Sequence, residues 1–143
     1  MTLLESWIGS ANFNACEFPL NNLPYGVFSN ENSNLKCGVA IGDMVLDCQA
    51  LEEMNLIDLG NEPVFKVPYW NKFMDLGHEK WTLFRYKLTE LLGKNSSQKE
   101  LIERLLVPQK QIDLHLPFQI TEYTDFYASK SHATNVGTMF RGK

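Results

Sequence analysis

The sequence contains little of what marks a secreted or membrane-spanning protein. It has only three cysteines, Cys16, Cys37 and Cys48, and no pair of them has Cys-x-x-Cys spacing. An odd, widely spaced set supports neither a disulfide framework nor a zinc site. The chain also lacks the run of roughly 18 apolar residues that a membrane span needs, and residues 1–7 carry no basic segment ahead of a long apolar stretch. We therefore expect three reduced thiols in a cytosolic protein with no membrane partner.

Clustered positive charge is missing as well. The 13 lysines and arginines are scattered among 17 acidic residues, which gives a net charge of −4. A nucleic-acid binder needs grouped basic side chains to neutralise phosphates, so we expect no nucleic-acid partner. The composition, 44% hydrophobic and 21% charged, is ordinary for a folded chain and excludes wholesale disorder. A length of 143 residues favours one domain with a sizeable core.

The first third of the chain is typical of strands and turns. Residues 18–28 contain two prolines and a glycine, which predict an extended or turning segment. Two apolar runs, residues 37–41 and 44–46, flank the dipeptide Gly42-Asp43. A glycine in the first position of a two-residue loop predicts a hairpin with a type II′ turn.

The middle of the chain favours helices. Residues 49–56 and 71–76 are short helix candidates. Apolar residues at helical spacing then predict a longer helix with one buried face, made of Trp81, Phe84, Leu88, Leu91 and Leu92.

A further helix and a last strand are expected before residue 117. Ser97 and Glu100 fit a capping box, and Pro108 is expected to end the helix that follows. The buried side of this helix is predicted to comprise Leu101, Ile102, Leu105 and Leu106. Alternation of apolar and polar residues then predicts a strand containing Ile112, Leu114 and Leu116.

These patterns together predict an α+β fold with a change of character after Pro117. Residues 1–117 are expected to form one small domain, a compact sheet or barrel with a helical insertion between the hairpin and the last strand. Residues 118–143 form a second unit with less periodicity and denser polar side chains. We expect this second unit to pack poorly in isolation.

The densest group of chemically useful side chains lies between residues 123 and 141. It combines a carboxylate, a phenol, an imidazole, an amide and a guanidinium: Asp125, Tyr127, His132, Asn135 and Arg141. These side-chain types hold metal ions, bind anionic substrates and move protons. The segment is therefore a candidate functional site, although each residue taken alone also has an ordinary structural role.

Asp125 and His132 are the candidates for metal binding and proton transfer. Carboxylate oxygen suits Mg²⁺ or Ca²⁺, but one carboxylate does not complete a Ca²⁺ site because that ion takes about 6–8 oxygens. The alternative for Asp125 is a turn or capping role. An imidazole can act as a general base near neutral pH. The alternative for His132 is a structural histidine, which is our interpretation of His78 and His115.

Arg141 and Tyr127 are the candidates for substrate binding. A guanidinium can pair with a substrate carboxylate through two parallel hydrogen bonds, and a phenol can hydrogen-bond a substrate oxygen. The alternatives are a solvated surface charge for Arg141 and a core ring for Tyr127.

Residues 123–143 resemble the start of the catalytic domain in the fumarylacetoacetase family. Residues 22–29 and 38–43 are similar to the N-terminal domain of that family, so the resemblance runs from about Ser6 to the last residue. It implies an SH3-like β-barrel followed by a mainly-β catalytic domain, assembled as a homodimer. It also implies hydrolysis of the carbon–carbon bond of fumarylacetoacetate to fumarate and acetoacetate, in tyrosine and phenylalanine breakdown.

The resemblance also implies a role for each candidate residue. Asp125 matches a ligand of the family's Ca²⁺ or Mg²⁺ ion. His132 matches the base that activates water, and Tyr127 and Arg141 match substrate-binding positions. The family's other metal ligands, the carboxylate partner of the histidine and most of the pocket lie further along the chain.

Three hypotheses follow from this partial match. The first is that the sequence is a fragment of a fumarylacetoacetase, covering its N-terminal domain and the first strand and loop of its catalytic domain, and is inactive alone. The second is a natural short product, a non-catalytic interaction module that docks on full-length protomers. The third is a metal-free structural domain, for which the terminal motif would be a coincidence.

Overall fold

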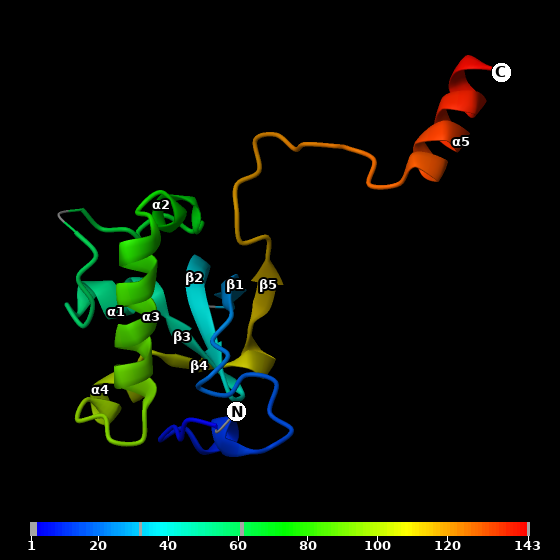
Figure 1. Cartoon of the computed structure of the whole chain (residues 1–143). Helices are drawn as coiled ribbons and strands as arrows, with labels where there is room; N and C mark the ends of the chain where they lie inside the picture. Colours follow the sequence, from blue (N-terminus) through cyan, green and yellow to red (C-terminus); the bar gives the residue numbers. More distant parts are fainter. Residues whose placement is uncertain (1–2, 32, 61, 143) are drawn as a thin grey trace.

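The computed structural model describes residues 3–31, 33–60 and 62–142. Within residues 3–117 these form one antiparallel sheet with helices on one side of it, and a last helix near the C-terminus lies apart (Figure 1). The strands follow the order β4-β3-β2-β1-β5 across the sheet. Their bounds are β1 Tyr25–Asn30, β2 Ser33–Ile41, β3 Met44–Asp47, β4 Leu106–Pro108 and β5 Asp113–His115. The helices are α1 Cys48–Glu53, α2 Asn71–Met74, α3 His78–Leu92, α4 Lys99–Glu103 and α5 Lys130–Arg141, with short 3-10 turns at Gly9–Asn12 and Gln109–Gln111.

The predicted hairpin is confirmed between β2 and β3. Ile41 pairs with Met44, which leaves Gly42 and Asp43 as the loop. Gly42 has a φ of 57°, whereas Asp43 is not among the residues with positive φ. Positive φ at the first loop position alone is the signature of a type II′ turn, whose twist matches that of the flanking strands.

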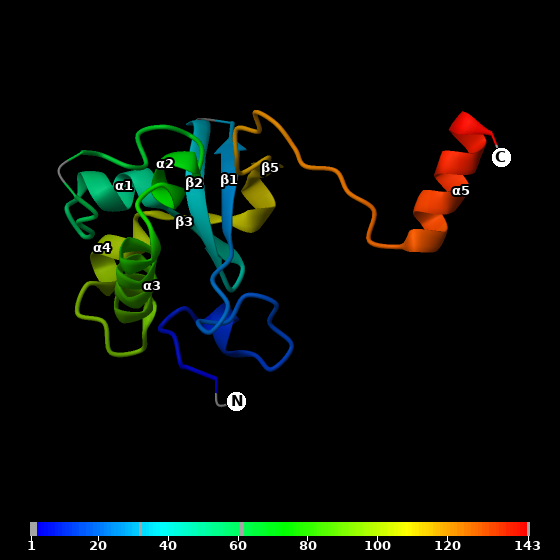
Figure 2. The same ribbon diagram turned by 45° about the horizontal axis from the view of Figure 1, so that its top comes forward.

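The α+β class is confirmed, with the helical insertion α1–α4 between β3 and β4 as predicted. Both views show these helices on the same side of the sheet (Figure 2). In the described residues β4 and β5 are the two edges and pair with β3 and β1 respectively. The sheet is therefore open rather than closed into a barrel by backbone pairing. No described helix is long and apolar enough to cross a membrane.

Five aromatic side chains join the helices to the sheet: Tyr25, Phe65, Trp70, Phe73 and Phe84. Tyr25 on β1 stacks on Trp70, with ring centroids 4.6 Å apart and planes 8° apart. The indole N–H of Trp70 donates to the carbonyl of Gly26 at 2.8 Å, so this large ring is buried with its polar atom satisfied. The predicted buried face of α3 is confirmed at its last four positions. Trp81 differs: it is 40% exposed and its indole N–H donates to the Phe73 carbonyl.

The region after α3 departs from the sequence-based prediction. The N-cap of α4 is Gln98, without a side-chain capping bond, so the Ser97–Glu100 capping box is wrong. Leu101 is 39% exposed rather than buried. The helix ends at Glu103, and Pro108 lies in strand β4 instead of closing a helix. Residues 106–108 form a strand instead because the edge of β3 is open for pairing. An edge strand tolerates Pro108 because the N–H that proline lacks would not be needed for pairing there.

Gly38 lies where there is no room for a side chain. A Cβ at this position would be 2.6 Å from Val45 Cγ1 and 2.7 Å from the Phe28 ring. Both neighbours are buried and cannot swing aside. We expect Gly38→Ala to lower the free energy of unfolding by about 1–3 kcal/mol through overpacking. Gly26 is its register partner, and a Cβ added there would meet no described atom within 4 Å, so Gly26→Ala is the matched control. Equal urea midpoints for the two variants would contradict the prediction.

The chain leaves the folded body after β5. The strand predicted around Leu114 is confirmed, although Leu114 and Leu116 are 76% and 70% exposed. The carbonyl of Pro117 accepts a hydrogen bond from the Trp70 backbone, and Asn71 holds the backbone of Gln119 through two hydrogen bonds. Beyond this anchor an extended stretch leads to α5, which lies apart from the sheet (Figure 1).

The expectation of a first catalytic-domain strand in this segment is wrong for the described residues. They contain irregular chain up to Ser129 and then α5, and none of the α5 residues is buried. A lone strand leaves its backbone groups without partners, whereas a helix satisfies its own. The expected poor packing of this segment agrees with the exposed position of α5.

Candidate functional site

Helix α5 carries three of the candidate residues and begins at a defined point. Ser129 has extended backbone angles (φ −123°, ψ 124°), and its Oγ accepts a hydrogen bond from the His132 N–H at 3.3 Å. Serine is a favoured N-cap because its side chain satisfies one of the donors that the first helical turn leaves free. The imidazole of His132 is therefore placed in the first turn of α5, close to the preceding loop.

Tyr127 and His132 are brought together. Their ring centroids are 5.2 Å apart, with the planes tilted by 57°. Tyr127 lies in the loop before the N-cap, so the turn into α5 folds the phenol back toward the imidazole. Both side chains are exposed. Of the residues predicted from the sequence, these two form a contact.

Arg141 is not brought to the same side of α5 as His132. The two residues are nine positions apart, which at 100° per residue places them on opposite faces, separated by about 13 Å along the helix axis. Asn135 is one turn after His132 and shares its face. The helix therefore presents an imidazole–amide face near its start and a cation at its other end.

Asp125 lies in exposed, irregular chain, and nothing in the described residues adds further metal ligands beside it. Among those residues there is no group of three or more His, Cys, Asp or Glu side chains placed to hold a metal ion. Asp125 supplies at most two oxygens, whereas Ca²⁺ takes about 6–8 and Mg²⁺ requires a near-octahedral set. The described residues therefore do not form a complete site for either ion.

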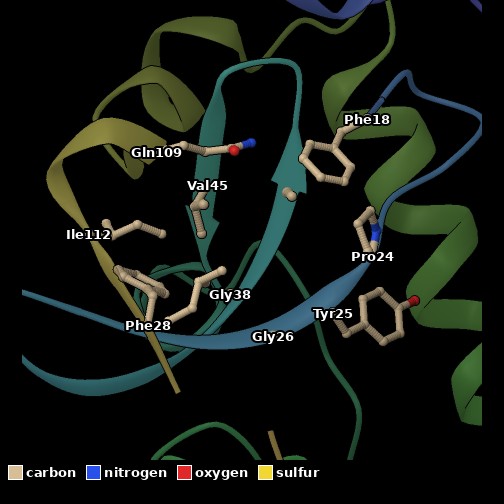
Figure 3. A pocket seen from close by; sticks show the side chains of 11 residues that line it. Phe18, Pro24, Tyr25, Gly26, Phe28, Gly38, Val45, Gln109 and Ile112 are labelled. Atoms are coloured by element: carbon tan, nitrogen blue, oxygen red, sulfur yellow. The ribbon is translucent and has the colours of Figure 1, made fainter. Parts of the chain in front are cut away.

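A second candidate site is an apolar pocket of about 300 Å³ on the sheet face opposite the helices. Figure 3 shows Phe18, Pro24 and Tyr25 at one end and Phe28, Val45 and Ile112 at the other. Gly26 leaves part of this space open, because a Cβ added there would meet no described atom within 4 Å, whereas a Cβ on Gly38 would already clash with Val45 and Phe28. The sequence signal for this pocket is a glycine inside strand β1, a signal that the predictions above did not use.

The pocket lacks the groups that acid–base chemistry needs. Its one titratable lining residue is Tyr25, and burial raises the pKa of that phenol above its ordinary value, although the Arg85 guanidinium beside it acts in the opposite direction. The ring of Tyr25 itself stacks on Trp70 on the helix side of the sheet. The rest of the lining is apolar except for Gln109, which suits binding of an apolar group. The pocket and the residue 125–141 segment are therefore chemically different sites.

The cysteines do not provide a nucleophile. Burial, with a smaller effect of the Asp47 carboxylate, raises the pKa of the Cys37 thiol to about 12. Burial also raises the pKa of Cys48 well above its ordinary value. Only the thiolate is reactive, so both groups are inert in the folded protein near neutral pH. Cys16 is partly exposed, and all three thiols are free.

We expect iodoacetamide at about pH 8 to modify Cys16 while Cys37 and Cys48 stay unmodified, because a thiol with a pKa near 12 has about one thiolate in 10⁴ at that pH. Peptide mass spectrometry would identify the labelled positions. Unfolding in urea is the control and should expose all three thiols. Labelling of Cys48 as fast as Cys16 in the folded protein would contradict the burial described here.

Comparison with known proteins gives a consistent set of relatives. Residues 21–117 match the family model described as fumarylacetoacetase N-terminal. The fumarylacetoacetase of Dictyostelium discoideum is 43% identical over 150 residues, covering 100% of this chain and 35% of its own length. Those of Bos taurus and Homo sapiens are 43% and 40% identical over 134 residues, covering 89% of this chain and 32% of theirs. The chain thus spans about a third of the length of these relatives, and its similarity to the Dictyostelium protein includes the residue 125–141 segment.

Proposed function

The chain belongs to the fumarylacetoacetase N-terminal family, and from this membership we propose that it is part of a hydrolase that splits fumarylacetoacetate into fumarate and acetoacetate. The observation that carries the proposal is the 43% identity to the Dictyostelium fumarylacetoacetase over the whole chain. The matched part includes Asp125, Tyr127, His132 and Arg141, to which we assign roles below. The pathway we infer is tyrosine and phenylalanine breakdown.

We assign the proton transfer to His132. Its imidazole would take a proton from a water molecule as that water attacks a substrate carbonyl, and would return the proton to the carbon that leaves as acetoacetate. The carbon–carbon bond breaks in this step, so one water molecule is consumed for each substrate. The exposure of His132 leaves room for both the water and the substrate.

We assign substrate binding to Tyr127 and Arg141. The Tyr127 phenol can donate a hydrogen bond to a substrate oxygen beside His132, since the two rings are in contact. Arg141 can pair with a substrate carboxylate through its planar fork of N–H groups. Its place on the far side of α5 means that the carboxylate lies away from the reacting carbonyl, as the extended shape of a dicarboxylate substrate allows.

Asp125 is proposed as one ligand of a Ca²⁺ or Mg²⁺ ion, with the other ligands supplied by residues outside this chain. We further propose a cytosolic homodimer with residues 1–117 as an SH3-like domain and residues 118–143 as the first segment of a mainly-β catalytic domain. The exposed apolar side chains on β5 and after it support burial in such an assembly: Leu114, Leu116, Ile120, Phe126, Met139 and Phe140.

The isolated chain is expected to be inactive, because Asp125 cannot hold the ion alone and His132 has no carboxylate partner among the described residues. The test is to add fumarylacetoacetate with Ca²⁺ or Mg²⁺ and follow loss of substrate absorbance. A hybrid in which the chain replaces the matched third of the Dictyostelium enzyme is the positive control. An inactive hybrid that folds normally would contradict the proposed function, and turnover by the isolated chain that His132→Ala abolishes would contradict the ligand argument.

A second function is favoured by one observation, the self-contained core of residues 3–117. The sheet and α1–α4 bury their own apolar side chains, so this part does not need a catalytic domain to fold. We therefore also consider a non-catalytic interaction module that docks on full-length protomers. Mixing the chain with a full-length relative at micromolar concentration should give co-elution on size-exclusion chromatography, and separate elution would remove this alternative.

A further inference from the structure

The segment that carries the candidate catalytic residues is organised by one small side chain, that of Ser129. Its Oγ accepts the His132 N–H at 3.3 Å, and its backbone carbonyl accepts the N–H of Ala133 at 3.0 Å. Both bonds belong to the first turn of α5. Ser129 thus fixes where the helix begins, and thereby which residue occupies the third helical position.

The same residue determines how Tyr127 meets His132. Ser129 adopts extended backbone angles, whereas the residues from Lys130 onward are helical, so the chain changes direction at this position. That change of direction brings the ring of Tyr127 to 5.2 Å from the ring of His132. The contact is local in sequence and forms although α5 lies apart from the sheet (Figure 2).

We propose that Ser129 is a positioning residue for the hydrolytic reaction: its side chain holds His132 and Tyr127 in one relative orientation by capping α5. The proposal rests on the proposed function for its catalytic consequence. Its structural part, that the cap creates the Tyr127–His132 contact, stands on the geometry alone. Ser129 itself need not touch substrate, because it acts through the backbone of His132.

The structural part is tested in the 143-residue chain by NMR. The unsubstituted protein should show a nuclear Overhauser effect between the rings of Tyr127 and His132 and helical carbon shifts from residue 130. Ser129→Ala should weaken the effect by up to about fivefold, because loss of a typical N-cap lowers the equilibrium constant for the capped form by that factor. Ser129→Asn should keep the effect, because asparagine caps as well as serine does.

Ser131→Ala is the matched control. Ser131 is also an exposed serine in the first turn of α5, but the N-cap bond of that helix comes from Ser129. Its replacement should leave the ring contact unchanged. An unchanged contact in Ser129→Ala, or an equal loss in Ser131→Ala, would overturn the structural part.

The catalytic part is tested in the hybrid with the Dictyostelium enzyme. Ser129→Ala should lower kcat by up to about fivefold, in proportion to the loss of the capped population, with KM within about twofold. Ser129→Asn should restore kcat. Full kcat for Ser129→Ala in an otherwise active hybrid would overturn the positioning role and leave the proposed function intact. If the unsubstituted hybrid folds but does not hydrolyse the substrate, the proposed function is wrong. The catalytic role of Ser129 is then wrong too, whatever the NMR result.

Discussion

Replacing Phe84 by alanine is expected to lower the free energy of unfolding by about 3–5 kcal/mol, the cost that large-to-small substitutions of buried aromatic residues produce. A domain of this size has a total stability of about 5–15 kcal/mol, so the substitution should remove a large fraction of it. Urea unfolding followed by tryptophan fluorescence would measure the effect, because Trp70 is adjacent to the substituted ring.

The size of this effect follows from where α3 places the ring. Phe84 is fully buried, and its centroid lies 5.0 Å from Phe73, 5.3 Å from Phe65 and 5.6 Å from Tyr25. These partners come from α2, from the loop before it and from β1. Removing the Phe84 ring leaves a cavity where α2, the loop before it and β1 meet. The neighbouring rings belong to these different segments, so they cannot fill the cavity unless the helices move.

Tyr86→Ala is the matched control, because it removes an aromatic ring from the same helix two residues further on. Tyr86 is 60% exposed, and a surface substitution changes stability by about 0.5 kcal/mol or less. Alanine has the highest helix propensity, so neither variant weakens α3 itself. Similar urea midpoints for Phe84→Ala and Tyr86→Ala would show that the aromatic cluster does not hold the domain together.

The features that could be predicted from the sequence are those that local rules determine. The II′ hairpin follows from Gly42 in the first loop position, and the buried face of α3 follows from helical spacing. Strand β4 could not be predicted in the same way. Residues 106–108 continue an apolar helical pattern, and only the open edge of β3, far away in sequence, converts them to a strand. Tertiary pairing overrides local pattern in this case.

The candidate site shows the same division. The Tyr127–His132 contact is produced by a cap and a turn within six residues, and both residues were candidates from the sequence. Their roles in the reaction stay predictions. Arg141 and His132 lie on opposite faces of α5 because residues 130–141 are helical. That helix was not predicted from the sequence. The apolar pocket could not be predicted because its lining comes from three segments far apart in the sequence, residues 18–28, 38–45 and 109–114.

The largest functional effect is expected for His132→Ala in the hybrid with the Dictyostelium enzyme. General acid–base catalysis by a positioned side chain contributes about 10²–10⁴-fold, so kcat should fall by that factor. KM should change little, because the imidazole acts on water and on the leaving carbon rather than on the groups that bind substrate. Initial rates of fumarylacetoacetate loss over a range of substrate concentrations would separate the two parameters.

Two features of α5 make this substitution informative. Alanine favours helix more than histidine does, and the capping bond from Ser129 goes to the backbone N–H, so α5 should begin at the same residue in the variant. A loss of rate then reports the imidazole rather than unfolding of the segment. Added imidazole should restore part of the rate, because a free base can enter the space that the side chain vacates.

His115→Ala is the control for loss of a histidine elsewhere. His115 lies on β5, and its Nε2 is 2.8 Å from the Ser29 hydroxyl, a bond that links β5 to β1. Its replacement should affect stability slightly and leave kcat within about twofold, because an exposed side-chain hydrogen bond contributes about 1 kcal/mol to folding and nothing to the chemistry. A fall of less than tenfold in kcat for His132→Ala, or an equal fall for His115→Ala, would contradict the prediction. Another group would then be the base, and proton transfer could not be assigned to His132 in the first turn of α5.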